Sequence, residues 1–360
     1  QMKDNTGTGL VIDGFYMMDE AFETKTLQDA SGQTATSNFA DMTVLRDWFN
    51  QNFGDKYFHV NHVPISSYDH YTDGNGNPAT AINAAYYQKF LENYRAKFNA
   101  QLPDAAGSSI SFDNYPFTHK AGFNISSFKT LPGIEETYLL NCLIAARTAG
   151  AYDFGMCIQT FEASDLKNKT ERDIKSAAEV SFQIYTGMAM GADLFEYFAY
   201  NSNGDFSTIM NQDGSKRIYD LVLEGNQALC FADVVGSFAW NGIVTSTGTK
   251  NSGNSAAFQS VEDMVLTNIS NGVLSSYSST DDAIIGCFTK GELNGYMLVN
   301  YNDPAEVTGN NSVTVSFENC TRARVYTEVD GVLTSQIVDL TNGSYTAILA
   351  PGTGCFIIPA

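Results

Sequence analysis

Two patterns of apolar and polar residues divide this chain near residue 240. Before that point, short apolar runs alternate with longer stretches whose apolar residues recur every three or four positions. Strands that alternate with helices in this way favour a parallel sheet covered by helices. The runs that predict strands are residues 14–20, 56–64, 109–117, 154–162 and 192–200.

The stretches between these runs predict the helices, and the segment 21–40 is a polar loop in this interpretation. The expected helices are residues 41–53, 80–100, 134–149, 170–189 and 215–235. Five strand–helix units cannot close an eight-stranded barrel. Because Gln1 is not an initiator methionine, we expect either the C-terminal part of a longer barrel protein or a complete open sheet.

After residue 240 the helical spacing stops, and short apolar runs are separated by turn residues. Asn294–Gly295, Asp330–Gly331 and Asn342–Gly343 favour tight hairpins, since both residues of such pairs tolerate positive φ. Short strands at regular spacing predict an antiparallel β-sandwich. We therefore expect a partial barrel domain over residues 1–240 and a sandwich domain over 241–360, with 240–257 as the linker or edge loop.

Charge and composition narrow the class of partner. The net charge of −20 disfavours binding to nucleic acid and to anionic membranes, because phosphate groups would be repelled. The six cysteines form no CxxC pair, and we assign no disulfide, metal site or cofactor. The few lysines and many Asn, Ser, Thr and Gly residues slightly favour an extracellular or cell-envelope location over the cytoplasm. The predicted sandwich would cover the barrel or mediate a homo-oligomer.

Acidic, amide and aromatic residues gather where the predicted strands end. In barrels of strand–helix units, function lies at these carboxyl ends. Carboxylates that converge on an aromatic cleft are typical of glycoside hydrolysis, where one acid protonates the leaving oxygen and a second carboxylate attacks the sugar or activates water. The residues at the strand ends are Asp19, Glu20, His59, Asn61, His62, Asp113, Asn114, Tyr115, Gln159, Glu162, Glu196 and Tyr200.

Several of these residues have a structural alternative. Asp19 and Glu20 are adjacent in a strand and point to opposite sides, so only one of them can face the barrel interior directly. The structural alternative for these residues is a helix N-cap or a loop ion pair. Glu196 lies between two aromatic residues and either pairs with a cation or lines the cleft. His59 and His62 have no evident third metal ligand, which favours a polar cleft lining over a metal site.

Taken together, the motifs resemble strands four to eight of clan A glycoside hydrolases, in particular family 42 β-galactosidases and their bacterial relatives. GADLFEYFAY (191–200) is similar to the eighth strand, and GFYMMDE (14–20) resembles the fourth strand with its acid/base pair. SISFDNYPF (109–117) resembles a segment of the relatives, FGMCIQTFE (154–162) falls at the seventh, nucleophile-bearing strand, and PGTGCFIIP (351–359) resembles the last strand of a closing sandwich.

The resemblance implies a (β/α)8 TIM barrel whose first strands lie upstream of Gln1, followed by a β-sandwich. It implies cleavage of a β-linked glycoside or oligosaccharide, a β-galactoside among the candidates. Glu20 would be the general acid/base and Glu162 the nucleophile or base. The implied substrate-binding residues are Asp19, Asn61, His62, Asp113, Tyr115, Gln159 and Glu196.

Two departures from the family pattern keep other functions open. Asp19 stands where family 42 has Asn, and the best alignment puts Ile158 or Gln159 where its nucleophilic Glu should be. Glu162 lies three or four residues later and can take over that role, in a retaining or an inverting mechanism. The alternatives are a non-catalytic carbohydrate-binding protein on the same scaffold and an unrelated open-sheet protein.

Overall fold

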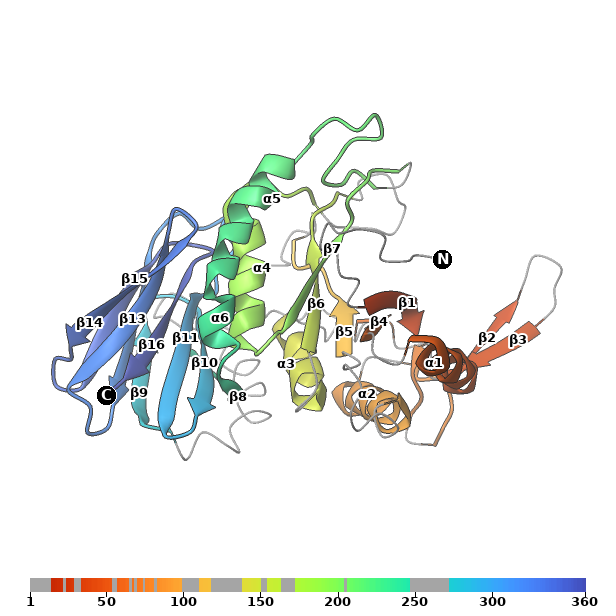
Figure 1. Cartoon of the computed structure of the whole chain (residues 1–360), viewed down its shortest axis with the longest axis horizontal. Helices are drawn as coiled ribbons and strands as arrows, with labels where there is room; N and C mark the ends of the chain where they lie inside the picture. The colour runs from red at the N-terminus through yellow and green to blue at the C-terminus, as the bar shows by residue number, and fades with distance from the viewer. Residues whose placement is uncertain are drawn as a thin grey trace. The chain divides into compact units, whose positions relative to one another are not determined.

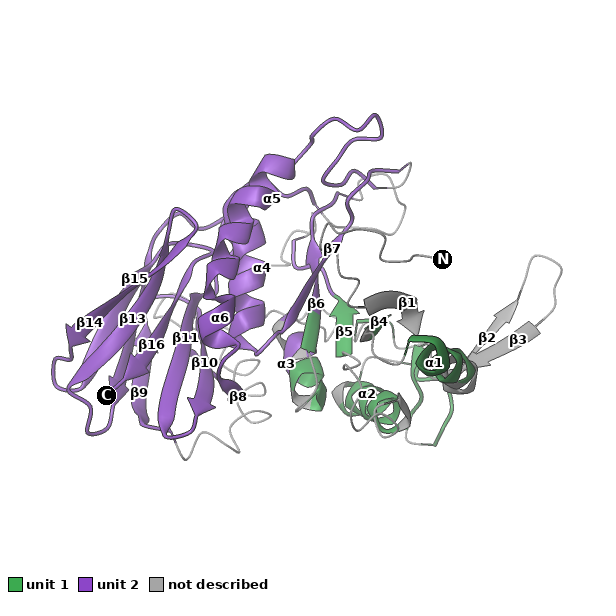
Figure 2. Cartoon of the chain, viewed as in Figure 1, with its two compact units in different colours: residues 1–113, 144–155 green, residues 114–143, 156–360 purple. Residues whose placement is uncertain are grey.

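The structure is a computed structural model that divides into two compact units (Figure 2). Unit 1 comprises residues 1–113 and 144–155, and unit 2 comprises residues 114–143 and 156–360. The described residues are 14–21, 24–28, 34–53, 57–64, 67, 70–73, 75–80, 83–98, 110–117, 138–149, 154–162, 172–203, 206–246 and 272–360.

Unit 1 is built on parallel strands in chain order, as the strand–helix alternation predicts. The strands β1 (Gly14–Ala21), β4 (Tyr57–His62) and β5 (Ile110–Asp113) are neighbours in this order, and both pairings are parallel. The helices α1 (Phe39–Phe53) and α2 (Ala84–Phe98) follow β1 and β4 along the chain, and α3 (Tyr138–Ala149) has residues in both units. The unit 1 core is aromatic, with the rings of Phe49 and Phe58 5.2 Å apart.

One element of unit 1 differs from the prediction. The segment 21–40 contains an antiparallel hairpin of β2 (Thr24–Gln28) and β3 (Thr34–Asn38), where the sequence predicted only a loop. The two strands, TKTLQ and TATSN, contain many β-branched threonines but almost no apolar residues. Threonine favours strands through its branched side chain, so hydrophobic alternation does not reveal this hairpin.

Unit 2 begins with the remaining barrel-type elements (Figure 1). The strands β6 (Phe154–Gln159, whose first two residues belong to unit 1) and β7 (Leu194–Phe198) are neighbours in their sheet. The helix α4 (Ala177–Ala189) starts seven residues later than predicted, because Ser176 is its N-cap and Glu179 accepts the free N–H groups of Lys175 and Ser176. The predicted helix 215–235 is three consecutive segments, α5 (Tyr219–Gly225), η3 (Asn226–Phe231) and α6 (Ala232–Val235).

Two antiparallel sheets complete unit 2, and they share one hydrophobic core. Within the described residues, one sheet has the strand order β14-β13-β16-β11-β10-β8 and the other β15-β12-β9. Valines of β12, such as Val313 and Val315, meet Leu298 and Val325 of the larger sheet in this core. The bounds are β8 (Ala239–Ser246), β9 (Leu274–Ser279), β10 (Ala283–Lys290), β11 (Leu293–Asn300), β12 (Asn311–Phe317), β13 (Arg322–Val329), β14 (Val332–Asp339), β15 (Ser344–Leu349) and β16 (Gly354–Pro359).

The helix α4 joins these sheets to β6 and β7 through close glycine contacts, and Figure 1 shows it between the two parts. A Cβ at Gly187 of α4 would meet the Phe195 ring of β7 and the Met156 sulfur of β6. A Cβ at Gly286 of β10 would clash with the Ala189 carbonyl at the end of α4. The predicted domain boundary at residue 240 therefore falls within unit 2, one residue after β8 begins.

The strand and turn predictions after residue 240 have mixed outcomes. Asp330–Gly331 and Asn342–Gly343 have positive φ and form the predicted turns on either side of β14. The turn predicted at Asn294–Gly295 is wrong, since both residues pair with β10 inside β11 and the chain reverses at Gly291, where φ is 60°. The strand β9 was not predicted, and β8 occupies part of the predicted linker. The apolar run 261–269, which also predicts a strand, lies outside the described residues.

Candidate active site

In unit 1, a polar cluster lies at the carboxyl ends of β4 and β5. The Ser111 hydroxyl donates a hydrogen bond of 2.9 Å to Asn61 Oδ1 and lies 3.3 Å from His59 Nε2. Asp113 follows Ser111 by two residues on β5, so it shares the same face of the strand. Asn61 and His59 are buried, and Asp113 is half-buried. This face thus brings together three of the polar residues that the sequence singled out.

His62 lies on the other side of β4 and is the exception among these residues. Its Nδ1–H donates to the Ser111 backbone carbonyl at 2.9 Å, and its ring packs edge-on against Tyr94 of α2 at 4.2 Å. Burial lowers the pKa of His62 to about 4, so the imidazole is neutral near pH 7. With no exposed surface, His62 supports the packing of α2, and this placement does not favour the predicted contact with substrate.

Asp19 and Glu20 belong to β1, where Met18 pairs with Val60 and Ala21 with His62. The register shifts between these two pairs, so β1 is irregular at the predicted acid/base residues. The side chains of Asp19 and Glu20 lie outside the described residues. Their roles as substrate ligand and acid/base therefore stay predictions.

In unit 2, Gln159 ends β6 and is fully buried. Its Oε1 accepts a hydrogen bond from the Phe117 N–H at 2.9 Å, and its Nε2 donates to the carbonyls of Phe117 at 3.0 Å and Arg172 at 2.9 Å. Both amide hydrogens are thus used within the protein. Gln159 ties the segment after β5 to β6, and this arrangement does not support its predicted contact with a sugar.

The Arg172 side chain also joins these segments, through contacts of its positive charge. Its guanidinium lies over the Phe117 ring at 4.8 Å and forms two hydrogen bonds of 3.1 Å with the carboxylate of Asp303, in the segment after β11. It also pairs with the buried Glu179 of α4. One buried cation therefore pairs with two buried carboxylates beside Gln159, which lowers the penalty of burying them.

An aromatic cluster lies beyond the ends of β6 and β7. It consists of Tyr115, Phe161, Phe198 and Phe206, whose rings meet mostly edge-to-face at centroid distances of 4.7–6.1 Å. Phe161 is buried and the other three are half-buried. The Tyr115 hydroxyl lies 3.7 Å from the Cys157 sulfur on β6. Half-exposed rings of this kind can pack against the C–H groups of a bound molecule.

Two half-buried glutamates lie close in the chain to members of the aromatic cluster. Glu162 lies three residues past β6, next to Phe161, and its backbone exchanges hydrogen bonds of 2.9 and 3.1 Å with Ser207. Glu196 precedes Phe198 by two residues on β7, so its side chain shares the face of Phe198 while Tyr197 points to the other side. The structure thus brings the predicted residues Tyr115, Glu162 and Glu196 to one region of unit 2.

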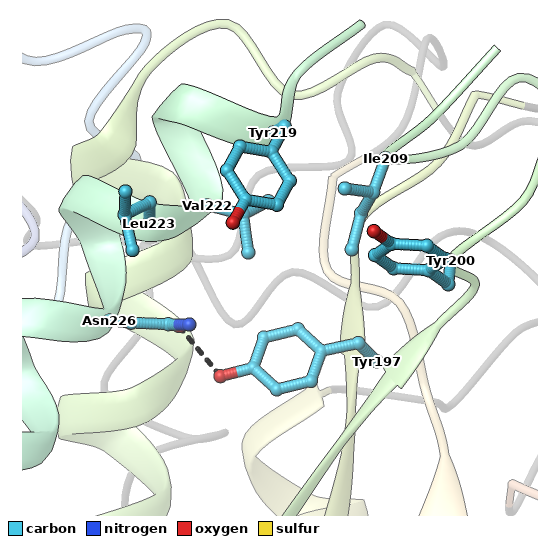
Figure 3. Close-up of a pocket in the computed structure, with 7 residues that line it drawn as sticks. All are labelled: Tyr197, Tyr200, Ile209, Tyr219, Val222, Leu223 and Asn226. Atoms are coloured by element: carbon cyan, nitrogen blue, oxygen red, sulfur yellow. Dashed lines mark hydrogen bonds between the residues drawn. The ribbon is translucent and has the colours of Figure 1, made fainter. Parts of the chain in front are cut away.

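The sequence reasoning missed a pocket on the opposite side of β7 (Figure 3). It has a volume of about 390 Å³ and lies between β7 with its following loop and α5. Only Tyr200 among its residues was singled out from the sequence, as a strand-end residue. A signal did exist, since four of the lining residues recur at helical spacing. The lining residues are Tyr197, Tyr200, Ile209, Tyr219, Val222, Leu223 and Asn226.

Among the described residues, no group of three or more His, Cys, Asp or Glu side chains is arranged to hold a metal ion. Nor does any helix in the described ranges combine the length and apolar character needed to cross a membrane.

Comparison with known proteins gives similarity in structure only. No protein-family description matches the sequence. No curated protein matches it either. Similar solved structures include a family 30 endoxylanase from Clostridium papyrosolvens C71, at 12% identity and a TM-score of 0.33. The aligned part covers 94% of this chain and 76% of the xylanase. An Anoxybacillus alpha-amylase has 11% identity, a TM-score of 0.40, and coverage of 94% and 70%. A structure described as a glycoside hydrolase has 12% identity, a TM-score of 0.41, and coverage of 97% and 86%.

Proposed function

We propose that this chain hydrolyses glycosidic bonds, with carboxylates at the carboxyl ends of its parallel strands. The observation that carries the proposal is the pair Glu162 and Glu196 beside the aromatic cluster at the ends of β6 and β7. Hydrolysis of a glycoside needs two carboxyl groups on opposite sides of the scissile bond, and the cluster offers ring faces for the sugar.

The finer roles follow from the resemblance of the strand motifs to clan A enzymes. Glu20 on β1 would protonate the leaving oxygen, and Glu162 would attack the anomeric carbon or activate water. Glu196 shares its face of β7 with Phe198 of the aromatic cluster and would hold a sugar hydroxyl or replace Glu20 as the acid. Asp19, Asn61, Asp113 and Tyr115 would position the sugar. The substrate would be a β-linked glycoside, for which β-galactosides are the first class to test.

The test is release of product by the purified chain from p-nitrophenyl β-galactoside, β-glucoside and β-xyloside and from the matching β-1,4-linked polysaccharides. We expect Glu162→Gln to lower kcat by at least about 100-fold with the fold intact, as loss of an acid/base group does. Glu20→Gln and Glu196→Gln then show which residue is the acid. Glu292→Gln, at an exposed turn before β11, is the matched control and should keep full activity.

The anomer released first, read by proton NMR, fixes the geometry of the catalytic pair. Retention implies carboxyl groups about 5–5.5 Å apart, and inversion implies about 6.5–9.5 Å. Full activity of Glu162→Gln on every active substrate would reject Glu162 as nucleophile or base.

A second candidate is a carbohydrate-binding protein without activity, and Gln159 favours it. The family resemblance puts Gln159 or its neighbour at the nucleophile position, and this residue is an amide whose hydrogens are already bonded. This candidate predicts saturable binding of oligosaccharides with no product after prolonged incubation. Release of any product excludes it.

A further inference from the structure

Among the described residues, the side chains that line the pocket beside β7 are all uncharged, and three of them are tyrosines (Figure 3). Tyr197 comes from β7, Tyr200 from the loop that follows, and Tyr219 from the start of α5, so the three rings surround the cavity from different elements. Its volume of about 390 Å³ lies in the range of small-molecule sites. Tyr200 and Leu223 at its rim are 57% and 59% exposed, so the pocket offers accessible ring and apolar surface.

Hydrogen bonds and charges hold two of the three rings in place. The Tyr197 hydroxyl donates to Asn226 Oδ1 at 2.7 Å, which leaves the Asn226 amide hydrogens available as donors. The Lys216 ammonium lies 4.6 Å from the centre of the Tyr219 ring and pairs with Asp220 at 2.8 Å. A site whose walls are already ordered loses less entropy on binding a ligand.

Backbone hydrogen bonds hold the loop after β7, which carries the third ring, Tyr200. The carbonyl of Tyr200 accepts a hydrogen bond of 2.8 Å from the Met210 N–H, and the Ile209 N–H donates to Ala199 at 3.3 Å. The Ile209 carbonyl in turn accepts from Ile218, just before α5, at 3.2 Å. The loop after β7 is thereby tied to the helix on the other side of the pocket.

The chemistry of the lining selects a class of ligand. No described lining residue is a cation, and the Lys216 ammonium beside Tyr219 is already paired with Asp220, so an anionic ligand would lack a free counter-charge in a chain of net charge −20. A pure hydrocarbon would leave the phenol groups and the Asn226 amide without use. A neutral ring with apolar C–H faces and several hydroxyl groups matches both the tyrosine faces and these polar groups, and a pyranose sugar has this character.

We infer that this pocket is a second carbohydrate site, which takes one or two neutral pyranose units of a glycan chain. It is separate from the proposed reaction site, because Glu196 lies on the face of β7 opposite to Tyr197. The inference rests on the proposed function for its ligand class. The pocket holds the glycan and takes no part in bond cleavage, since no carboxylate belongs to its lining in the part of the chain that the structure describes.

The test is methyl NMR of the full chain labelled at isoleucine, leucine and valine methyl groups. Ile209, Val222 and Leu223 report from inside the pocket, and Ile348, exposed on β15, is the internal control. The probes are cellotetraose, xylotetraose and β-1,4-galactotetraose, with p-cresol as an apolar aromatic probe. We use Glu162→Gln as the background, so that hydrolysis does not consume the sugars.

We expect at least one tetrasaccharide to shift the three pocket methyls saturably and to leave Ile348 in place. Tyr200→Ala, at an exposed position, should weaken this binding about ten-fold, the scale of one aromatic anchor. In the active chain, the substitution Leu223→Ser should leave kcat on a p-nitrophenyl glycoside unchanged, because Leu223 lies on α5 and not at a strand end. Leu223→Ser is the second variant and should also weaken binding.

Two results would overturn the inference: no tetrasaccharide shifts the pocket methyls, or only p-cresol shifts them. The proposed function fails separately, when the active chain releases no product from any glycoside while the pocket methyls still respond to sugar. Hydrolysis without any response of the pocket methyls rejects the second site alone.

Discussion

The carboxamide of Gln159 forms two hydrogen bonds with the backbone of Phe117: Oε1 accepts from the Phe117 N–H at 2.9 Å, and Nε2 donates to the Phe117 carbonyl at 3.0 Å. This contact joins the segment after β5 to β6 within unit 2. It also explains why an amide serves at Gln159, which with Ile158 is one of the two positions where the family resemblance expects a carboxylate. A carboxylate could accept from the Phe117 N–H but could not donate to the two carbonyls.

Gln159→Glu therefore tests whether this position is catalytic or structural. We expect the free energy of unfolding at pH 7 to fall by about 2–4 kcal/mol, because a charged, buried carboxylate would face two carbonyl oxygens. The loss should shrink at acidic pH, where the neutral acid can donate one hydrogen bond. Urea unfolding at pH 7 and pH 5 measures both effects. A stable variant with increased hydrolysis would instead show that the position is a vacant nucleophile site.

His62 predicts a pH dependence of stability. Its folded pKa of about 4 lies below the unfolded value of 6.5 because burial disfavours the cation. The unfolded chain therefore binds a proton that the folded chain does not. The contribution is complete above pH 6.5 and is lost as the pH falls towards 4, by about 2–3 kcal/mol at pH 4.5.

The comparison is with His62→Gln, which keeps an N–H donor for the Ser111 carbonyl but does not titrate. Between pH 7 and 4.5 the variant should lose about 2 kcal/mol less stability than the natural sequence in urea unfolding. The His62 Cε1–H resonance should also keep its neutral shift down to pH 5. A midpoint near 6.5 in that titration would contradict the buried placement.

Arg172 predicts a large cost for breaking a buried ion network. Arg172→Met leaves the carboxylates of Glu179 and Asp303 buried without their cation, so we expect a loss of about 3–5 kcal/mol. The matched control is Arg322→Met, whose partner Asp339 is exposed, with an expected loss of about 0–1 kcal/mol. Thermal or urea unfolding distinguishes the two. Equal, small losses would mean that the Arg172 network does not stabilise unit 2.

Gly286 predicts a steric limit between β10 and α4. A Cβ at Gly286 has no room against the Ala189 carbonyl, so Gly286→Ala should destabilise unit 2 by about 1–3 kcal/mol through forced backbone movement. Gly309→Ala is the control, since no atom lies within 4 Å of its added Cβ, and its effect should stay within about 0.5 kcal/mol. Unfolding curves of both variants check this. A Gly286→Ala variant with an unchanged free energy of unfolding would contradict the close approach of β10 to α4.

Hydrophobic spacing predicted most of the elements. The predicted strands 14–20 and 154–162 overlap β1 and β6, and the predicted helices 41–53 and 134–149 overlap α1 and α3. The sequence prediction failed for the threonine-rich hairpin, whose strands contain few apolar residues. It also failed where an Asn–Gly dipeptide lies inside a strand, as Asn294–Gly295 does in β11. A dipeptide that tolerates positive φ does not require it, and pairing with β10 fixes its conformation.

The sequence by itself determined the alternation of strands and helices before residue 240, the change to short β-strands after it, and the placing of polar residues at strand ends. These depend on local spacing, which is written in the chain. Only the tertiary structure decided that His62 faces α2, that the Gln159 side chain is hydrogen-bonded to the Phe117 backbone, and that three tyrosines surround one pocket. These outcomes depend on which side chains from distant segments compete for the same hydrogen-bonding groups and the same space, and a linear pattern does not contain that information.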